Sequence, residues 1–201
     1  YSSDPIVIDF GRDGLEFIEL EHSAARFDID GVSRRSAWIG RGEGILALDA
    51  NQDGRIDRLD EIAFGSHVGQ PFISDLQALQ DATFDRNQDA VFDARDPMWA
   101  QFLVWQDVNG NGSSDAGELR SMDEAGIEAL YLNANVLNRA EGPDVRVRGY
   151  TRVLMSDGSL LQAADVWLGL DNPDATEGSA PDPSMQQVTQ LGSDQFAALL
   201  R

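Results

Sequence analysis

Cysteine and lysine are both absent from this 201-residue chain. Without cysteine the chain has no disulfide framework, no thiol nucleophile and no zinc site of the thiolate kind. No apolar run approaches the roughly 20 residues of a membrane-spanning helix. The opening residues, YSSDPIVIDF, contain neither an initiator Met nor a signal peptide. We therefore expect no membrane insertion, and the sequence reads as a piece of a longer protein.

Basic side chains are scarce, whereas acidic ones are abundant. There are 35 Asp and Glu against 15 basic residues, all of them Arg, and the formal net charge is -20. Such an excess repels nucleic acid, so none is expected as a partner, and it opposes a compact state unless something neutralises it. Because 42% of the residues are hydrophobic, a core can still form. Bound divalent cations would neutralise part of this negative charge and so allow the chain to fold around a core.

Short strand-like runs alternate with clusters of Asp, Asn and Gly in the first half of the chain. Helical spacing is predicted over residues 73–82 and 93–102, and strands return after residue 127, with a hairpin at Asp157-Gly158. We therefore predict an α+β fold: a single compact domain of short strands and short helices, organised around several EF-hand-like calcium loops and ending in a β-hairpin.

Three parts of the chain are expected to differ in organisation. Residues 1–4 are interpreted as the end of an upstream segment, and residues 5–170 as the compact calcium-binding domain. Residues 171–201 are rich in Asp, Pro, Gly and Ser, which is typical of a flexible acidic linker or tail.

The segment DVNGNGSSDAGE has the ligand spacing of a calcium loop. Calcium prefers about six to eight oxygen ligands, and a loop of about twelve residues supplies them at positions 1, 3, 5, 7, 9 and 12, with a Gly at position 6. The expected ligands here are Asp107, Asn109, Asn111, the carbonyl of Ser113, Asp115 and Glu118.

Two other segments have the same spacing. The first offers Asp49, Asn51, Asp53, the carbonyl of Arg55, Asp57, and then either Asp60 or Glu61 as the closing carboxylate. The second offers Asp85, Asn87, Asp89, the carbonyl of Val91, Asp93 and Asp96. In the second, Ala90 replaces the turn glycine, which predicts a weaker site. An ordinary Asp/Asn turn is the alternative for any one loop, but three loops so close together make it a poor explanation.

Two further acidic clusters are degenerate. One contains Asp9 and Asp13 with Glu16, and the other contains Asp28 with Asp30. For both clusters, metal binding and a plain solvated turn remain open alternatives. Together with the three loops, they would supply sites for several calcium ions.

The order of these segments resembles the calcium-dependent self-processing module of FrpC-like RTX proteins, which Gram-negative bacteria export by type I secretion. The resemblance covers residues 4–170 and is carried by these segments: DPIVIDFGRDGLE, FDID with AWIG, GILALDANQDGRID, FDRNQDAVFDARDP, FLVWQDVNGNGSSDAGELRSMDEAGI and AADVWLGL. The sequence departs from the family at the shorter FDIDGVSRRSAW stretch and at Gly11, where Asp is common.

The resemblance implies that calcium loading triggers cleavage of the Asp4-Pro5 bond, and that the freed Asp carboxyl can be joined to a lysine amine. It also implies an upstream polypeptide of the same protein and a lysine-bearing acceptor as partners. The expected location is extracellular, either secreted or at the cell surface of a Gram-negative bacterium.

Asp-Pro suits such chemistry. The Asp4 carboxylate can close a five-membered anhydride on its own carbonyl carbon, and well-placed intramolecular groups reach effective molarities on the order of 10⁵ M. The proton donor to the departing Pro5 nitrogen stays open, with His22 and His67 as the only imidazoles. A turn at the domain entrance is the plain alternative for Asp4-Pro5. There are two alternative functions. One is a non-catalytic, calcium-stiffened spacer or adhesin segment, and the other is a dockerin-like binding module.

Overall fold

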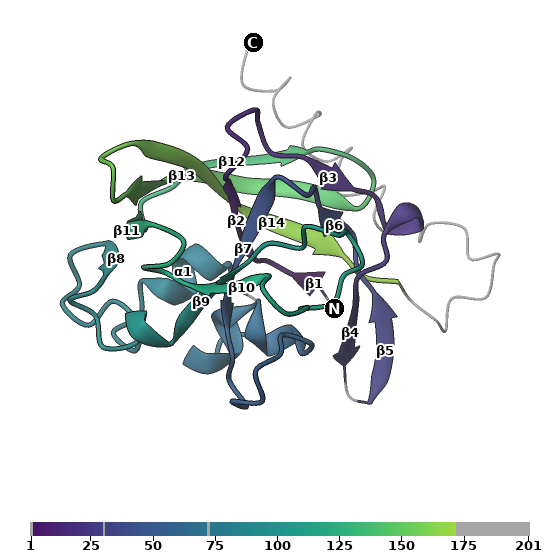
Figure 1. The fold of residues 1–201 in the computed structure, drawn as a ribbon, viewed down its shortest axis with the longest axis horizontal. Helices are drawn as coiled ribbons and strands as arrows, with labels where there is room; N and C mark the ends of the chain where they lie inside the picture. Colours follow the sequence, from purple (N-terminus) through teal and green to yellow (C-terminus); the bar gives the residue numbers. More distant parts are fainter. Residues whose placement is uncertain (1, 30, 72, 172–201) are drawn as a thin grey trace, which may run out of the picture. The chain divides into compact units, whose positions relative to one another are not determined.

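The computed structural model describes residues 2–29, 31–71 and 73–171, so the predicted tail lies outside the described residues except for Asp171. Their main feature is one ten-stranded antiparallel sheet, shown in Figure 1. Its strands, in spatial order, are β10 (Leu119–Ser121), β9 (Phe102–Trp105), β7 (Glu43–Leu48), β2 (Ile6–Asp9), β14 (Leu160–Gly169), β13 (Val145–Met155), β11 (Ile127–Tyr131) and β8 (Val91–Asp93), while β1 (Ser2–Ser3) pairs with β14 and β12 (Asn135–Ala140) with β13.

Smaller elements complete the described part of the chain. Two small sheets are formed by β3 (Phe17–Ile18) with β6 (Trp38–Ile39), and by β4 (Arg26–Ile29) with β5 (Val32–Arg35). The helical elements are α1 (Asp75–Leu79) and the 3-10 turns η1 (Leu20–His22), η2 (Leu59–Glu61), η3 (Phe64–Val68) and η4 (Trp99–Gln101).

The fold is mostly β, so the α+β prediction is wrong. Only part of the helix expected over residues 73–82 forms, as α1, and the helix expected over 93–102 is replaced by the end of β8, by η4 and by the start of β9. The EF-hand description is also wrong, because the loop at 107–118 joins strands β9 and β10 rather than two helices. Short apolar runs fit a buried strand as well as a helix, and periodicity alone does not separate them.

Hydrophobic side chains cover both faces of the main sheet. Ile6 and Ile8 pack into one core cluster, whereas Val7 between them packs into the other. The first cluster includes Phe64, Leu76 and other residues of the α1 side, and the second includes Trp38 and Trp105. Successive residues of a strand point to opposite faces, so a strand that is buried on both faces reads as a continuous apolar run.

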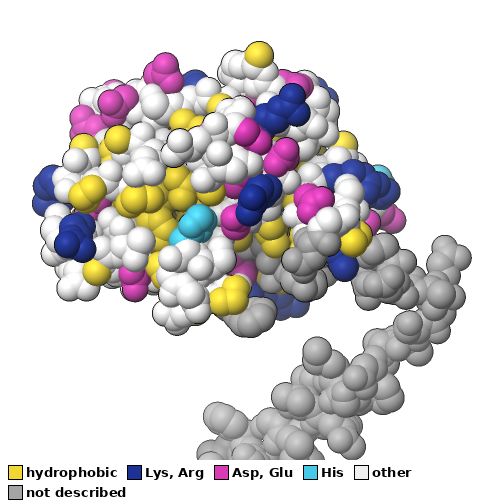
Figure 2. Space-filling view, turned by 90° about the horizontal axis from the view of Figure 1, so that it is seen from below, with side chains coloured by type: hydrophobic (Ala, Val, Ile, Leu, Met, Phe, Trp, Pro, Cys, Tyr) yellow, Lys and Arg dark blue, Asp and Glu magenta, His cyan; other side chains and the backbone are white. Residues whose placement is uncertain are grey.

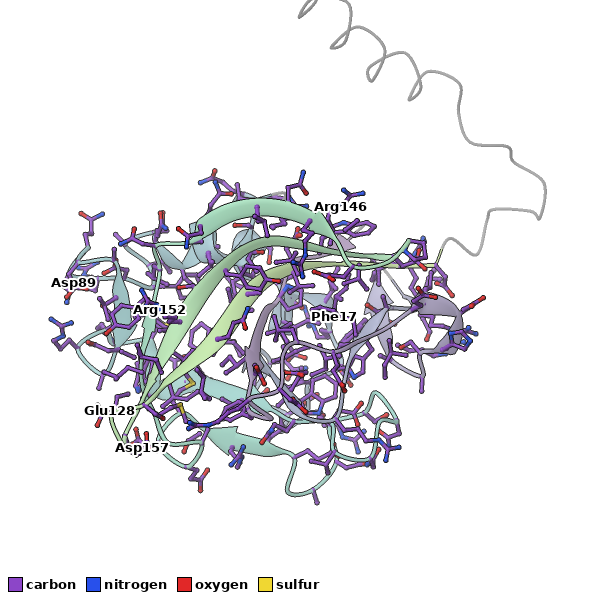
Figure 3. The ribbon with its side chains drawn as sticks, turned by 90° about the horizontal axis from the view of Figure 1, so that it is seen from above. Phe17, Asp89, Glu128, Arg146, Arg152 and Asp157 are labelled. Carbon is purple, nitrogen blue, oxygen red and sulfur yellow. The ribbon has the colours of Figure 1, made fainter. Side chains whose placement is uncertain are left out.

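The predicted C-terminal hairpin is confirmed. Strands β13 and β14 pair over nearly their whole length, and Gly158 in the turn between them has φ 80°. The register shifts between Val147 and Gly149, so Arg148 is the extra residue of a β-bulge. A bulge bends its strand and redirects side chains, and β13 and β14 are visibly curled in Figure 3.

The first two strands run along β14 in one register. Ser3 lies opposite Leu168, and Ile6 lies opposite Asp165. The pairing is therefore continuous, with no inserted residue, and the Pro5 carbonyl accepts a hydrogen bond from the Val166 N–H at 3.0 Å. Proline has no N–H to return, which interrupts the ladder between β1 and β2 at the Asp4-Pro5 peptide.

The surface mixes charges of both signs. Figure 2 shows Arg and acidic side chains interspersed around a strip of hydrophobic ones on the face that it displays. Within the described ranges, no helix is long and apolar enough to cross a membrane.

Candidate calcium loops and the Asp4-Pro5 site

The three predicted calcium loops share one hydrogen-bonding frame. In each, the first Asp accepts backbone N–H bonds from positions 5 and 6, as Asp49 does from Asp53 and Gly54 at 3.2 and 2.9 Å. Asp85 and Asp107 repeat this pattern. The side chains at positions 3 and 5 each accept from the N–H two residues further on. The regular spacing of the sequence thus becomes a regular loop geometry.

The structure separates the two candidates for closing the loop at 49–61. The Glu61 carboxylate accepts the N–H groups of Asp57 and Arg58, both at 3.0 Å, and Glu61 is fully buried. Asp60 instead forms an ion pair with Arg58 at 3.0 Å. In the other loops Asp96 and Glu118 occupy the closing place, because they accept the N–H groups of Asp93 and Asp115. Glu61 is therefore the structural equivalent of these two residues.

Burial changes the acidity of the Glu61 carboxyl. Its pKa is raised mainly by burial, an effect that its two backbone hydrogen bonds oppose and the nearby Asp57 and Asp60 charges reinforce. Among the described residues, Glu61 Oε1 has no hydrogen-bond partner. A buried carboxylate oxygen with no partner is costly, and a cation would satisfy it.

Backbone conformation repeats at position 6 of every loop. Gly54 has φ 79° and Gly112 has φ 69°, while Ala90 is held at φ 62° in the same left-handed region. A side chain at such a φ carries strain that glycine avoids. The position singled out in the sequence is therefore strained in the structure.

Side chains at the odd positions converge within each loop. Asn109 and Asn111 both donate to Asp115 Oδ2, at 2.9 and 2.8 Å, and these bonds lower the pKa of Asp115. In the loop at 85–96, the Arg95 guanidinium lies 2.8 Å from Asp89 and 2.6 Å from Asp93. Asp89 lies at the outer edge of the domain in Figure 3, at the same end as Glu128 and Asp157.

The loop at 107–118 contacts both the hydrophobic core and the loop at 49–61. Trp38 Nε1 donates to Asp107 Oδ2 at 2.8 Å, and the Trp38 and Trp105 rings pack with centroids 5.0 Å apart. The Ser114 hydroxyl accepts from the Ile56 N–H at 2.8 Å. The order of this loop is therefore coupled to the packing of buried aromatic rings.

A fourth, less regular loop begins at Asp9, whose carboxylate bonds to positions 4 and 6 rather than to positions 5 and 6. The Asp9 carboxylate accepts the N–H groups of Arg12 and Gly14, at 2.6 and 3.0 Å, and these two residues have φ 61° and 103°. Gly11 stands where the family commonly has Asp, and a Cβ there would lie 2.6 Å from Asp13 Oδ1. The Asp13 carboxylate thus occupies the space beside Gly11.

Glu43 of β7 completes this fourth loop from another strand. Carboxylate oxygens of Asp9, Asp13 and Glu43 lie within 4.8 Å of one another, and Glu43 Oε1 accepts the Glu16 N–H at 3.2 Å. Glu43 is 1% exposed. Burial, the largest cause, and the Asp9, Asp13 and Glu16 charges raise the pKa of Glu43 to about 7, against the effect of the Glu16 N–H bond.

Of the remaining acidic cluster, Asp28 and Asp30, only Asp28 is among the described residues. The Asp28 carboxylate accepts the Gly31 N–H at 2.8 Å in the β4–β5 turn, which is the plain turn role, and Asp28 pairs with Arg58 through an isolated bridge. Asp30 lies outside the described residues.

The Asp4-Pro5 peptide lies within the sheet, at the β1–β2 junction. Asp4 is 7% exposed, and its Oδ1 lies 2.7 Å from Arg148 Nε in an ion pair. Burial raises the pKa of Asp4, while Arg148 acts in the opposite direction through its charge and its hydrogen bonding. The side chain that the anhydride chemistry requires is therefore buried and held in place.

Two more carboxyls are buried near Asp4. Asp165 Oδ2 accepts the Leu76 N–H at 3.1 Å, and Asp75 Oδ1 accepts the Phe64 N–H at 2.6 Å. Burial raises the pKa of Asp75 well above its usual range, an effect reinforced by the Asp165 and Asp4 charges. Asp165 also lines a cavity of about 520 Å³, together with Ser74, Gln77, Gln80, Asn133 and Arg148.

Residues 6–169 match the model of the SPM domain family. The chain belongs to this family. FrpA, an iron-regulated protein of Neisseria meningitidis serogroup C, is 31% identical over 176 residues, a match that covers 84% of this chain and 16% of FrpA. The family predicted from the sequence is thus confirmed, and the SPM domain corresponds to a small part of the length of this relative.

Sequence reasoning missed several residues of the SPM domain that the structure brings to these sites. Glu43 had one usable signal, because it is an acidic residue at the start of the otherwise apolar strand run EGILAL. Asp165 had the same signal within AADVWLGL. Arg148 had none, since it alternates with Arg146 and Arg152 along β13 and only the tertiary contact with Asp4 distinguishes it. Neither histidine belongs to the site: His67 Nε2 contacts the Asp60 carbonyl and His22 lies beside Glu21 on the surface.

Proposed function

We propose that this SPM domain binds several calcium ions and, in its calcium-loaded fold, cleaves its own Asp4-Pro5 peptide bond. The observation that carries the proposal is the Asp4 carboxyl itself. It is buried in the sheet immediately before Pro5, in a strand whose register on β14 is unbroken, and it is ion-paired with Arg148. This is a fixed position for an intramolecular nucleophile.

The donor sets fit calcium. The three regular loops offer carboxylate, amide and carbonyl oxygens and the Asp9 group offers carboxylates, all of which calcium prefers. Two of the sets contain buried oxygens, Glu43 Oε2 and Glu61 Oε1, that have no hydrogen-bond partner among the described residues. The first loop would bind an ion through Asp49, Asn51, Asp53, the Arg55 carbonyl, Asp57 and Glu61. The others would use the ligands predicted at 85–96 and 107–118, and the group Asp9, Asp13 and Glu43.

Bound calcium would supply positive charge where carboxylates repel one another, which couples folding to metal binding. The Asp9 loop directly follows β2, so ordering that loop and its Glu43 partner holds β2 against β7 and β14. The scissile peptide, at the start of β2, is thereby held in place.

The chemistry at Asp4 needs no external nucleophile. The Asp4 carboxylate attacks the Asp4 carbonyl carbon, a five-membered anhydride forms and the Pro5 nitrogen leaves. Water then hydrolyses the anhydride, or a lysine amine of an acceptor protein opens it to an amide. The upstream polypeptide that ends at Asp4 is thereby released or transferred. We infer that this takes place outside a Gram-negative cell, where calcium is plentiful.

Mass spectrometry of the purified chain tests the proposal. Addition of calcium should release residues 1–4 and yield a fragment that begins at Pro5, and chelator should prevent this. Asp4→Asn should abolish cleavage and leave calcium binding unchanged. A chain that binds calcium, folds and stays intact would instead support a non-catalytic spacer module, and cleavage of the Asp4→Asn variant at the wild-type rate would rule out the anhydride.

A further inference from the structure

Asp165 lies on the same face of the sheet as Asp4. Asp165 is paired directly with Ile6, and the register along β1 and β2 is unbroken. Asp4 and Ile6 are two residues apart in an extended strand, so their side chains share a face. Asp4 and Asp165 are thus diagonal neighbours across adjacent strands, and the Pro5 nitrogen lies along the chain between Asp4 and Ile6, the residue opposite Asp165. Long or polar side chains interact at such a spacing.

Asp165 is positioned by its surroundings and keeps one oxygen free. The Leu76 N–H of α1 donates to its Oδ2 at 3.1 Å, which fixes the carboxyl. Its Oδ1 has no hydrogen-bond partner in the described part of the chain, although the residue is 2% exposed. Because the cavity beside Arg148 is also lined by Asp165, this buried carboxyl can exchange protons with solvent.

Three charged groups face Asp165 from the elements packed against it. They are Asp4 from the strand that carries the scissile bond, Asp75 from α1, and Arg148 from the β13 bulge. Burial raises the pKa of Asp165 to about 7, with Asp4 adding to the effect and the Ser74 hydroxyl, the Leu76 N–H and Arg148 opposing it. Near neutral pH the carboxyl therefore holds a proton in a substantial fraction of molecules, whereas an ordinary Asp would hold almost none.

We propose that Asp165 donates the proton that the Pro5 nitrogen requires as it leaves. This role rests on the cleavage proposed above. A bond forms between an Asp4 carboxylate oxygen and the Asp4 carbonyl carbon. The Asp165 proton moves to the Pro5 nitrogen, and the carbon–nitrogen bond breaks with its electron pair going to that nitrogen. The products are the cyclic anhydride, the free secondary amine of Pro5 and the Asp165 carboxylate.

The second half of the reaction returns a proton to Asp165. Water attacks the anhydride, and its proton passes to the Asp165 carboxylate, which leaves Asp4 with two carboxyl groups. An acid in the first step that serves as the base in the second has a pKa near the working pH, where general acid–base catalysis is most effective. Asp4 and Asp165 thus divide the roles: Asp4 reacts as the carboxylate, assisted by Arg148, and Asp165 reacts as the protonated acid.

The test is the pH dependence of cleavage at saturating calcium, measured as the rate of formation of the fragment that begins at Pro5. Wild-type cleavage should slow about tenfold for each pH unit above about 7, because Asp165 loses its proton. Loss of calcium does not explain such a decline, since carboxylate ligands bind metal more tightly as pH rises. Asp165→Asn should be at least about 10²-fold slower near pH 6 and should lack this alkaline decline. Asp75→Asn, which alters the neighbouring buried carboxyl, should keep it.

The outcomes separate the two proposals. An Asp165→Asn protein that shows the wild-type calcium-induced change in tryptophan fluorescence and cleaves at the wild-type rate overturns the role of Asp165, while the proposed function stands. Where that variant does not fold, the wild-type profile decides: a decline above about pH 7 supports the role, and a flat or rising rate overturns it. A wild-type chain that never cleaves removes the proposed function and this role together.

Discussion

Arg148 Nε lies 2.7 Å from Asp4 Oδ1. Arg148 is the bulged residue of β13, which is separated by β14 from β2, the strand that follows Asp4. Val147 packs into the second core cluster, so the next residue, Arg148, faces the opposite side of the sheet, where Asp4 lies. Because burial alone disfavours the carboxylate form, this one contact keeps Asp4 closer to its reactive ionised state.

Arg148→Met should therefore slow cleavage at neutral pH by about tenfold or more, because the pKa of Asp4 rises without the guanidinium. The loss should shrink as pH rises toward that higher pKa, since Asp4 ionises again, and the acid limb of the rate profile should move to higher pH. Arg146→Met, an exposed change in the same strand, is the matched control. Equal loss at every pH would show that Arg148 acts only on packing.

Glu61→Gln should weaken calcium binding at the first loop, whereas Asp60→Asn should leave it nearly unchanged. Glu61 is buried in the closing place, and Asp60 is bonded to Arg58 on the surface. Loss of a charged ligand typically costs about tenfold or more in affinity. Isothermal titration calorimetry measures the difference, and the reverse ranking of the two variants would contradict the loop geometry.

Glu43→Gln should remove one calcium ion from the loaded protein. Its carboxylate joins Asp9 and Asp13 from a different strand, and the neutral amide carries no charge to help hold the ion. Glu16→Gln, which alters the acidic side chain nearest in sequence to the same loop, should retain that ion. Native mass spectrometry counts bound ions, and an unchanged count in Glu43→Gln would show that the Asp9 cluster is a solvated turn.

Ala90→Gly should stabilise the calcium-loaded domain by about 1 kcal/mol, because Ala90 is held at φ 62° and an alanine there carries strain of about that size. Gly54→Ala should destabilise it by a similar amount, since a Cβ at Gly54 meets no atom within 4 Å and only the backbone is strained. Gly112→Ala should cost more, because its Cβ would lie 2.2 Å from Ala25 Cα. Urea unfolding in calcium measures all three, and equal effects of the two Gly→Ala changes would contradict this account.

Cleavage of the isolated chain should end in hydrolysis and not in cross-linking. The chain contains no Lys, and its Arg side chains stay protonated and are not nucleophilic at ordinary pH. Attack by the Pro5 amine only reverses the reaction. A ligated product should appear when a lysine-bearing protein is added, and peptide mass mapping distinguishes the products. An Asp4 linkage to a side chain of this chain would disprove the prediction.

The sequence by itself determined the family, the three regular loops and the C-terminal hairpin. These are local features: an oxygen-bearing side chain at every second position, a left-handed turn residue and an Asp-Gly turn are recognised within a few residues of one another. The same reading predicted Ala90 as a strained position, and its φ of 62° agrees. It misassigned the fold class, because short apolar runs that are buried on both faces have no periodicity to distinguish a strand from a helix.

Only the tertiary structure decided which distant residues meet. Glu43 reaches the Asp9 loop because β7 pairs with β2, and Asp165 shares a face with Asp4 because the register on β14 is unbroken. Arg148 meets Asp4 although it lies on β13, which is separated from β2 by β14. The choice of Glu61 over Asp60 also required the fold, since adjacent residues of the same charge differ only in which one is buried. Pairing, register and burial are set by the whole sheet and the packing of its two faces, so no local pattern contains them.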